Sequence, residues 1–252
     1  METGSTVNNE TVLEMANLGV LFGHKKSKTH PRMRPFIAGT KNEIELIDPE
    51  ATLVTLEAAA KAVEEVVERG ESVLLVGTLA PAREAVALFA RTFQFPYVTN
   101  RWLGGTLTNF KVISDRMRYY QELKEKRAAG EFAKYTKKEQ SKLSKTIGKL
   151  AKNFEGLAGF TKLPAILLVV DPKAHATAVA EAHHTGIPVV AILDTDDDPQ
   201  GITYPIYASD RAKSSIEWVM KVLTERAAAK QARLAEAPAE RAVRPPVGET
   251  AV

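Results

Sequence analysis

Short runs of consecutive apolar residues recur along the chain and are the clearest sign of its architecture. They are IELID at 44–48, VLLVG at 73–77, YVT at 97–99, AILLVVD at 165–171, VVAILD at 189–194 and PIYA at 205–208. Most of them are continuous rather than alternating, which is typical of strands buried on both faces of a parallel sheet. The pattern therefore predicts a parallel sheet built from these strands.

Apolar residues at helical spacing fill the intervals between the predicted strands. The helical stretches cover residues 51–70, 81–93, 173–186 and 210–230. Gly70 is expected just after the first of these helices, Pro81 in the first turn of the second, and Asp210 as the N-cap of the last. Strands that alternate with helices of this length favour βαβ units, so we expect a three-layer α/β/α domain.

A segment with a different pattern interrupts this alternation between Leu107 and Leu157. Its apolar residues fall three or four positions apart, at 107, 110, 113, 117, 120 and 123 and again at 143, 147, 150, 154 and 157. Such spacing predicts two helices, each with one narrow apolar stripe close to a coiled-coil seam. A linker with Gly130 separates them, and Thr136 and Glu139 form a T-x-x-E capping box. We therefore expect an antiparallel helical hairpin, inserted into the α/β domain, that packs on itself and projects outward.

These patterns divide the chain into a core and an insertion. The core is discontinuous, at 10–106 and 159–230, and the inserted hairpin covers 107–158. Residues 1–9 are expected to be flexible. Residues 231–252 are rich in Ala, Pro and Glu and have no sustained periodicity. They cannot bury enough apolar surface to offset the cost of ordering, so we expect a disordered tail.

The sequence NRWLGGTLTNF, at 100–110, lies between the short strand YVT and the hairpin. Paired glycines suit neither a helix nor a strand, but they permit positive φ angles and a close approach of backbones. We interpret Trp102, Gly104 and Gly105 as a structural joint that redirects the chain from the sheet into the hairpin, with Trp102 anchored by burial.

Three further residues of this stretch have expected roles. Thr106 or Thr108 is placed to cap the first helix of the hairpin. Arg101 is placed to reach a phosphate near its base. A simple turn would explain the glycines but would leave Arg101 and Trp102 without a function.

Composition places the chain among water-soluble globular proteins, with 44% hydrophobic and 26% charged residues in 252. It has no cysteine, which excludes disulfides and thiolate metal sites. The first residues lack the basic and apolar regions of a secretory signal, and the longest apolar runs are too short to span a bilayer. We therefore expect a cytoplasmic protein.

The net charge of +3 conceals a marked asymmetry. Residues 24–41 carry six basic residues and no acidic one. Residues 107–162 carry fourteen basic residues against six acidic ones, a net charge of +8. Cations concentrated in two blocks are typical of a surface that binds a polyanion.

The loop GHKKSKTHPRMRPF, at 23–36, is the densest basic segment. Pro31 and Pro35 exclude a regular helix, so we expect a semi-extended segment that can follow a phosphate backbone. A metal site at its two histidines lacks a third ligand at suitable local spacing. A solvated basic loop without a ligand is the alternative. The predicted RNA contacts of the loop and its following strand are His24, Lys25, Lys26, Lys28, His30, Arg32, Arg34 and Lys41.

Two other segments are candidate sites of small-molecule chemistry. Residues 77–81 (GTLAP) follow a strand and open a helix, but they lack both the Walker lysine and the G-x-G-x-x-G spacing, which favours a plain turn. Residues 194–198 (DTDDD) follow another strand, and clustered carboxylates can hold magnesium. The alternative is a solvated Asx-rich turn. We expect no catalytic residue, no cofactor and no metal.

Three segments together resemble a known family. They are GVLFGHKKSKTHPRMRPFIAG at 19–39, NRWLGGTLTNF at 100–110, and GIPVVAILDTDDDPQGITYPI at 186–206. The chain resembles the bacterial small-subunit ribosomal protein S2 family over roughly residues 10–225, and the middle segment is the most specific. The resemblance implies a flavodoxin-like α/β/α core with a parallel sheet, a protruding helical hairpin (coiled coil), and no catalysis.

The resemblance also implies a function, which is that of a structural constituent of the small ribosomal subunit that binds ribosomal RNA electrostatically and supports translation. The expected partners are small-subunit ribosomal RNA and neighbouring ribosomal proteins, including the mRNA-binding protein S1 where an organism has it. A membrane, a small-molecule substrate and homo-oligomerisation are not expected. At the start of the hairpin the expected RNA contacts are Arg101, Thr108, Asn109 and Lys111. The alternative function is a flavodoxin-like enzyme or receiver domain that binds magnesium or a nucleotide at residues 194–198.

Overall fold

The computed structural model describes residues 9–243, with side chains described as far as residue 233. Its centre is a parallel sheet of the order β5-β4-β6-β7-β8. The strands are β4 (Val73–Val76), β5 (Tyr97–Val98), β6 (Ile166–Val170), β7 (Val189–Leu193) and β8 (Tyr204–Tyr207). All residues of β4, β6 and β7 are buried, which is why their sequences read as continuous apolar runs. The predicted parallel sheet is confirmed.

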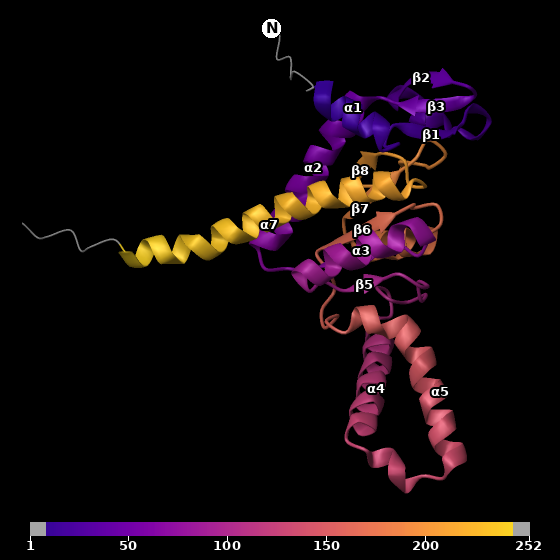
Figure 1. The fold of residues 1–252 in the computed structure, drawn as a ribbon, viewed down its shortest axis with the longest axis vertical. Coiled ribbons are helices and arrows are strands. Elements are labelled where there is room, and N and C mark those ends of the chain that lie inside the picture. The colour runs from indigo at the N-terminus through magenta and orange to yellow at the C-terminus, as the bar shows by residue number, and fades with distance from the viewer. Residues whose placement is uncertain (1–8, 244–252) are drawn as a thin grey trace, which may run out of the picture.

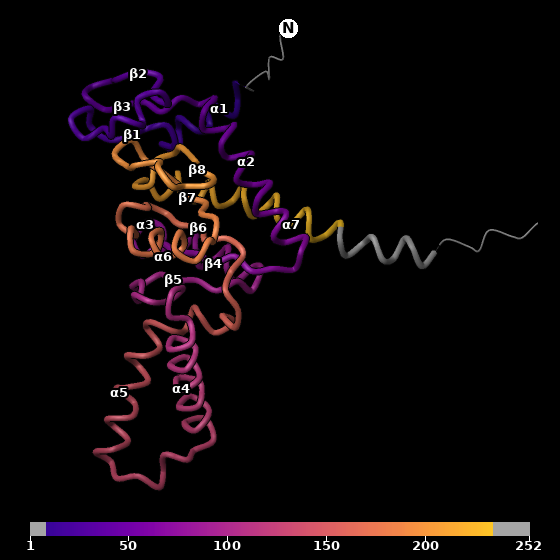
Figure 2. Tube along the Cα trace, turned by 180° about the vertical axis from the view of Figure 1, so that it is seen from behind, coloured from indigo at the N-terminus to yellow at the C-terminus, as the bar shows by residue number. Residues whose placement is uncertain are grey.

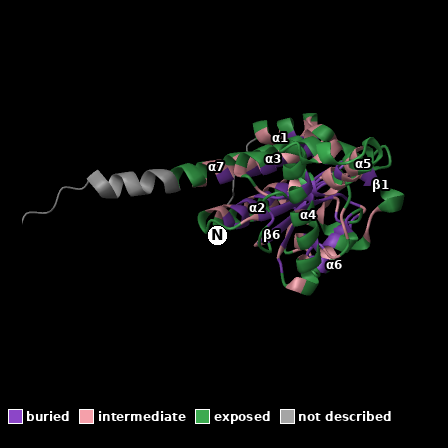
Figure 3. Cartoon of the chain, turned by 90° about the horizontal axis from the view of Figure 1, so that it is seen from below, coloured by how far each residue is buried: buried purple, intermediate pink, exposed green. Residues whose placement is uncertain are grey.

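Helices cover both faces of this sheet. Val73 and Leu75 of β4 pack in one cluster with α2 (Pro49–Glu68), α3 (Ala80–Phe93) and α7 (Lys213–Val243). The alternate residues Leu74 and Val76 pack in a second cluster with α6 (Ala176–Thr185) and the base of the hairpin. Figure 3 shows the buried strands enclosed by helices whose outer sides are exposed. The predicted three-layer α/β/α arrangement is therefore confirmed.

Residues 44–48 belong to a different sheet from the one predicted. Strand β3 (Ile44–Ile47) pairs antiparallel with β1 (Phe22–Lys25) and β2 (Ile37–Lys41) in the order β1-β3-β2. The short helix α1 (Asn9–Asn17) precedes this sheet, which lies beyond β8 at one end of the molecule (Figures 1 and 2). The apolar run was correctly identified as a strand, but both of its antiparallel partners precede it in the sequence, and neither is a continuous apolar run.

A two-residue turn connects β2 and β3. Asn42 and Glu43 lie between the paired residues Lys41 and Ile44, and their φ angles are 51° and 63°. Positive φ at both central positions is the requirement of a type I′ turn, for which Asn-Gly is the favoured pair. Asn42 suits its position, whereas Glu43 has a side chain in a backbone region that favours glycine.

The hairpin consists of α4 (Phe110–Ala128) and α5 (Lys137–Phe154), which project from the β5 end of the core (Figure 1). Between them lies the short 3-10 helix η3 (Glu131–Lys134). The predicted capping box is present, with Thr136 N donating to Glu139 at 2.9 Å. Every predicted seam position is buried or packs against the second core cluster. The inserted antiparallel hairpin is confirmed.

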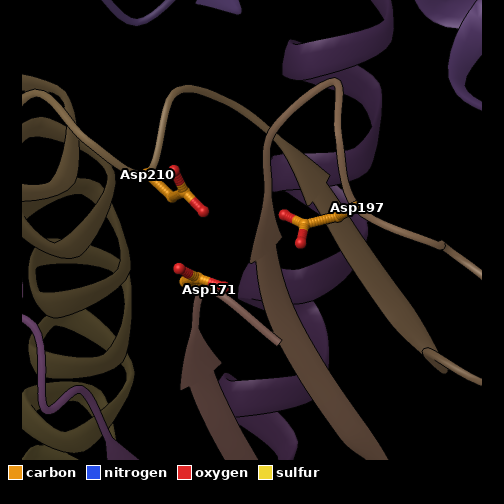
Figure 4. Close-up of side chains that lie close together, drawn as sticks. All are labelled: Asp171, Asp197 and Asp210. Atoms are coloured by element: carbon orange, nitrogen blue, oxygen red, sulfur yellow. The ribbon is translucent and has the colours of Figure 1, made fainter. Parts of the chain in front are cut away.

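The C-terminal helix differs from two expectations. It begins at Lys213 rather than next to Asp210, whose carboxylate lies instead among other carboxylates (Figure 4). It also continues to Val243, so residues 231–243 are helical where the sequence analysis predicts disorder. Most of these residues are Ala, Arg, Glu and Gln, which have high helix propensity, and extending an existing helix requires no new nucleus, although Pro238 opposes a helix. Residues 244–252 of the predicted tail lie outside the described residues.

Candidate nucleic-acid interface

The joint between sheet and hairpin is organised by one buried carboxylate, that of Glu181 on α6. Its Oε1 accepts hydrogen bonds from Trp102 Nε1 at 2.9 Å and from the Gly105 backbone N–H at 2.8 Å. Its Oε2 accepts from the backbone N–H groups of Leu107 at 3.0 Å and Thr108 at 3.3 Å, and from Thr108 Oγ1 at 3.2 Å. Glu181 therefore holds the start of the hairpin against the core.

The electrostatics of Glu181 follow from these contacts. Burial alone would raise its pKa, but the hydrogen bonds from Trp102, Leu107, Gly105 and Thr108 outweigh burial and hold the pKa below its usual value. A carboxylate that is 8% exposed and accepts several N–H groups remains ionised at neutral pH. Sequence analysis did not anticipate this residue. The only local signal was a glutamate between Ala178 and Ala182 on the buried face of α6.

The glycines and threonines of the joint behave partly as predicted. Gly105 has a φ of 89°, a conformation that favours glycine. A Cβ atom added at Gly104 would meet no neighbouring atom, so the space around Gly104 does not require glycine. The prediction that Thr106 or Thr108 caps α4 is wrong. The N-cap is Asn109, without a side-chain cap, because Thr108 bonds Glu181 and Thr106 Oγ1 donates to Leu103 O at 2.6 Å.

The predicted RNA contacts near the hairpin base remain accessible. Arg101, Thr108, Asn109 and Lys111 are all exposed. Neither Arg101 nor Lys111 forms an ion pair with a residue that the structure describes. Trp102 is half-buried and is held by its hydrogen bond to Glu181 as well as by packing. The joint thus presents cations at its surface and fixes its backbone from inside.

The basic loop is more structured than a semi-extended segment. Residues 26–28 and 31–36 form two short 3-10 helices, η1 (Lys26–Lys28) and η2 (Pro31–Phe36), between β1 and β2. A 3-10 helix of this length tolerates proline at its first position, where Pro31 lies. Met33 is fully buried and fixes the loop to the core.

An acidic loop lies against this basic loop, which sequence order did not reveal. His24 Nδ1 lies 3.0 Å from Asp194 Oδ2 and 3.2 Å from Asp196 Oδ1. The His24 side chain is only 5% exposed, so the predicted RNA contact of His24 is not supported by its position. Its backbone N–H also donates to Thr195 Oγ1 at 2.8 Å. The acidic and basic segments are some 170 residues apart in sequence, yet they lie in direct contact.

Asp198 makes the same kind of contact at the surface. Arg32 Nη1 lies 2.9 Å from Asp198 Oδ1 and 2.8 Å from Oδ2, and His30 Nε2 lies 3.9 Å from Oδ2. Slight burial opposes ionisation of Asp198, but the Gln200 N–H, Arg32 and His30 lower its pKa. Both side chains of the Arg32–Asp198 pair are about half exposed, so solvent screens the pair and it contributes little to stability.

The remaining cations of the loop are unpaired. They are Lys25, Lys26, Lys28, Arg34 and Lys41, which are exposed and form no ion pair within residues 9–233. The loop and the hairpin lie at opposite ends of the long axis of the molecule (Figures 1 and 2). The two basic blocks therefore form two separate surfaces rather than one continuous face.

A cluster of carboxylates lies at the C-terminal ends of the central strands. Asp171 follows β6, Asp197 follows β7 and Asp210 follows β8, and one oxygen from each lies within 4.8 Å of the others (Figure 4). Burial, followed by the surrounding carboxylates, raises the pKa of Asp210 to about 9. Burial likewise raises the pKa of Asp197 to about 7, against the effect of a backbone hydrogen bond from Asp194.

This cluster differs from the magnesium site considered for residues 194–198. Only Asp197 belongs to both groups, while Asp194 and Asp196 face His24 and Asp196 also pairs with Lys173 at 2.7 Å. Three carboxylate oxygens at this spacing are of the type that can hold a divalent cation. Protonation of Asp210 satisfies the same electrostatic need without a cation.

The fold and its surfaces define a scaffold protein, in which a rigid α/β core holds cation-rich elements at two ends. The chain belongs to the ribosomal protein S2 family, whose profile matches residues 15–230. It is 45% identical over 210 residues to small ribosomal subunit protein uS2 of Roseiflexus sp. (strain RS-1), an alignment that covers 83% of this chain and 80% of the relative.

Two further relatives give the same result. The uS2 protein of Rhodopirellula baltica is 41% identical over 217 residues, which cover 86% of this chain and 84% of the relative. The uS2 protein of Chloroflexus aggregans is 40% identical over 218 residues, which cover 86% of this chain and 91% of the relative.

Proposed function

We propose that this chain is a structural, non-enzymatic constituent of the small ribosomal subunit that binds ribosomal RNA through its two cation-rich ends. The names of its relatives, small ribosomal subunit protein uS2, support the structural role. The observation that carries the RNA-binding proposal is the set of exposed, unpaired cations on the loop and the hairpin. Lysine and arginine side chains in this state can neutralise phosphates and release counterions.

The exposure of the charged side chains supports a narrower set of RNA contacts. At the loop end the contacts are assigned to Lys25, Lys26, Lys28, Arg34 and Lys41, with the exposed Arg32 and the half-buried His30 shared between RNA and Asp198. His24 supports the loop from inside. At the hairpin end Arg101, Thr108, Asn109 and Lys111 flank the joint. Because these contacts are mainly to phosphate, recognition depends on the shape of the RNA more than on its base sequence.

The rest of the proposal concerns partners and setting. The protein acts in the cytoplasm as a single copy, in contact with neighbouring small-subunit proteins and with the mRNA-binding protein S1 where an organism has it. None of the helices within the described residues is long and apolar enough to cross a membrane. A magnesium- or nucleotide-dependent enzyme or receiver is not favoured, since the family is a ribosomal one and most of the 194–198 carboxylates face the basic loop.

A competition between charge variants tests the loop end. The test variant replaces the exposed cations Lys25, Lys26, Lys28 and Arg34 with Gln. The control makes the same change at Lys61, Arg69, Lys213 and Lys221, which form exposed ion pairs on α2, at its C-terminal end and on α7. Both variants lose four positive charges. We expect the test variant to bind small subunits that lack this protein at least about tenfold more weakly at moderate salt, with little change in the control. Equal binding of test variant and wild type would refute the role of the loop.

A further inference from the structure

Helices α3 and α7 lie side by side on one face of the core (Figure 1). Between them runs a groove of about 430 Å³. Its floor is apolar, because Ala85 and Phe89 of α3 and Met220 of α7 are buried there. Leu88 and Thr224 also line it, together with charged side chains. The groove lies between the two cation-rich ends of the molecule and belongs to neither of them.

Leu88 makes this groove more than a seam between two helices. It is 67% exposed, more than any other large hydrophobic residue among those that the structure describes. Single exposed leucines are common on soluble proteins and need no explanation by themselves. Leu88, however, stands beside an apolar floor, and after the first turn of α3 the other exposed residues of the helix are polar. These polar residues are Arg83, Glu84, Arg91 and Thr92.

The charged side chains of the groove are mainly carboxylates. Glu84, Glu217 and Glu225 line it, and Lys221 is the one cation among the lining residues that the structure describes. Lys213, which does not line the groove, lies 2.6 Å from Glu84 Oε2 and 3.5 Å from Glu217 Oε1, and Lys221 lies 3.8 Å from Glu225 Oε1. All of these side chains are about half exposed or more, so solvent screens the pairs and they can rearrange around a partner.

Negative charge also prevails over the rest of the chain outside the two basic blocks. Of 34 basic and 31 acidic residues, the blocks at 24–41 and 107–162 hold 20 and 6, which leaves 14 basic and 25 acidic residues elsewhere. A phosphate backbone is repelled by a surface of this sign. The groove therefore does not suit a nucleic acid, but it suits a partner with an apolar centre and positive charge around it.

The length and shape of the groove fit an α-helix. From Glu217 to Glu225, α7 advances about 12 Å, or about two turns, at 1.5 Å per residue. Two helices packed side by side leave a groove into which the side-chain ridge of a third helix can insert. Such a helix places apolar residues at positions i, i+3 or i+4 and i+7 against Leu88 and Met220. Lysine or arginine residues beside that stripe then meet the carboxylates of the groove.

Proteins that assemble on RNA are rich in lysine and arginine, so the neighbours of this chain in a small ribosomal subunit are a source of such helices. A second copy of this chain matches less well, because it would bring identical carboxylates to the groove. The chain's own residues 244–252 begin with Arg-Pro-Pro, a sequence that does not favour a helix. The charge and shape of the groove therefore favour a different protein as its occupant.

We propose that the α3/α7 groove docks a basic amphipathic helix of a neighbouring small-subunit protein. Leu88 and Met220 supply the apolar contacts, and Glu84, Glu217 and Glu225 pair with the cations that flank the apolar stripe. The proposal rests on the ribosomal function proposed above and specifies the chemistry of one protein neighbour, which that function leaves open. RNA and protein contacts are thereby assigned to different surfaces of the chain.

Site-specific photo-crosslinking in intact small subunits tests the docking. A photoreactive phenylalanine derivative replaces Leu88 in the full-length chain, and the matched control carries it at Val54, which is 63% exposed on α2. Crosslinked peptides are identified by mass spectrometry. We expect position 88 to crosslink to a segment of another small-subunit protein that has apolar residues three or four positions apart and lysines or arginines beside them. Position 54 should not crosslink to that segment.

The opposite results are equally specific. Crosslinks from position 88 to RNA, to a second copy of this chain, to residues 244–252 or to a segment without that pattern would overturn the proposal. The same segment captured from position 54, or no crosslink from position 88, would also overturn it. Absence of the wild-type chain from purified small subunits would overturn the proposed function and the groove proposal with it. The two failures are distinguishable, because the first is seen in subunits that contain the chain.

Carboxylate labelling provides a second measurement that needs no variant. A carbodiimide with a small amine is applied to the free chain and to intact small subunits, and each glutamate is quantified by mass spectrometry. Glu217 and Glu225 should lose most of their labelling in the subunit, whereas Glu65 and Glu71, which are exposed outside the groove, should keep it. Unchanged labelling of Glu217 and Glu225, or an equal loss at all four residues, would overturn the proposal.

The substitution Leu88→Asp separates docking from folding. The matched control is Val54→Asp, and both residues are so exposed that neither change should unfold the chain. In subunits that carry Leu88→Asp, the labelling of Glu217 and Glu225 should return toward the level of the free chain, whereas Val54→Asp should keep their protection. Protection that persists in Leu88→Asp would overturn the proposal.

Discussion

Replacing Glu181 with Gln tests the joint that carries the hairpin. The substitution keeps the shape of the side chain but replaces one acceptor oxygen with an NH₂ group. If the remaining oxygen faces Leu107 and Thr108, the N–H groups of Trp102 and Gly105 lose their acceptor. Hydrogen bonds to a charged group contribute about 1.5–3 kcal/mol, and a buried donor left without a partner costs about 1–3 kcal/mol. Because the Trp102 and Gly105 sites are only partly buried, we expect the free energy of unfolding to decrease by about 3 kcal/mol in total.

Such a loss is large compared with the stability of a typical domain, which is about 5–15 kcal/mol. Urea unfolding gives the change in the free energy of unfolding, and thermal unfolding should show a decrease in Tm of about 6–12 °C. The control is Glu65→Gln, which changes an exposed glutamate of α2 and should leave Tm nearly unchanged. A destabilisation by Glu181→Gln below about 0.5 kcal/mol would refute the reasoning.

The two tryptophans provide an internal check on the location of this effect. The indole N–H of Trp102 bonds Glu181, whereas Trp218 lies on α7 in the other core cluster. In Glu181→Gln, hydrogen exchange of the Trp102 indole should accelerate while that of Trp218 stays as in wild type. The contribution of Glu181 also depends on pH. Its folded-state pKa is below the unfolded value, so its stabilisation is complete above the unfolded pKa and is lost as the pH falls through the folded pKa.

Three further substitutions test other parts of the structure. In chelator-containing buffer, Asp210→Asn should raise Tm more at pH 8 than at pH 5. The difference between the two stabilisations should exceed about 1 kcal/mol, because the raised pKa makes the native state bind a proton that the unfolded state releases. An equal effect at both pH values would show that burial does not perturb this carboxyl. Glu43→Gly should raise the free energy of unfolding by about 0.5–1 kcal/mol in urea titrations, since it removes a side chain from a φ of 63°, and a loss of stability would exclude the type I′ turn. Asp198→Asn should change stability by less than about 1 kcal/mol but tighten binding to small-subunit RNA, because it frees Arg32; weaker binding in a filter-binding assay would contradict that view of the loop.

The parts of the fold that were predictable from sequence depend on local patterns. The buried strands at 73–77, 165–171 and 189–194 were identified from their continuous apolar runs, and the hairpin from its three- and four-residue spacing. Strand pairing is not local. Residues 44–48 read as another buried strand, but nothing in that run distinguishes an antiparallel partner of β1 and β2 from a member of the central sheet.

The exposure of the charged loop residues agrees with the sequence, whereas contacts between segments distant in sequence were not predicted. The lysines of the loop are on the surface as expected, but no sequence pattern places Asp194 and Asp196 against His24. Glu181 was missed for the same reason, because its donors lie more than 70 residues earlier in the chain. The helix in 231–243 was not predicted because the segment has no apolar stripe; its Ala, Glu and Arg residues favour a helix, whereas Pro238 opposes one.

The central claim is that the exposed cations at the two ends of this protein bind RNA phosphates. Cryo-electron microscopy of the intact small subunit that contains this chain tests it most directly. The prediction is that RNA phosphates lie within ion-pair distance of the unpaired loop cations at one end and of Arg101 and Lys111 at the other, with His24 and Glu181 still buried inside the protein. Density in which both ends face solvent, with no nucleic acid beside them, would contradict it.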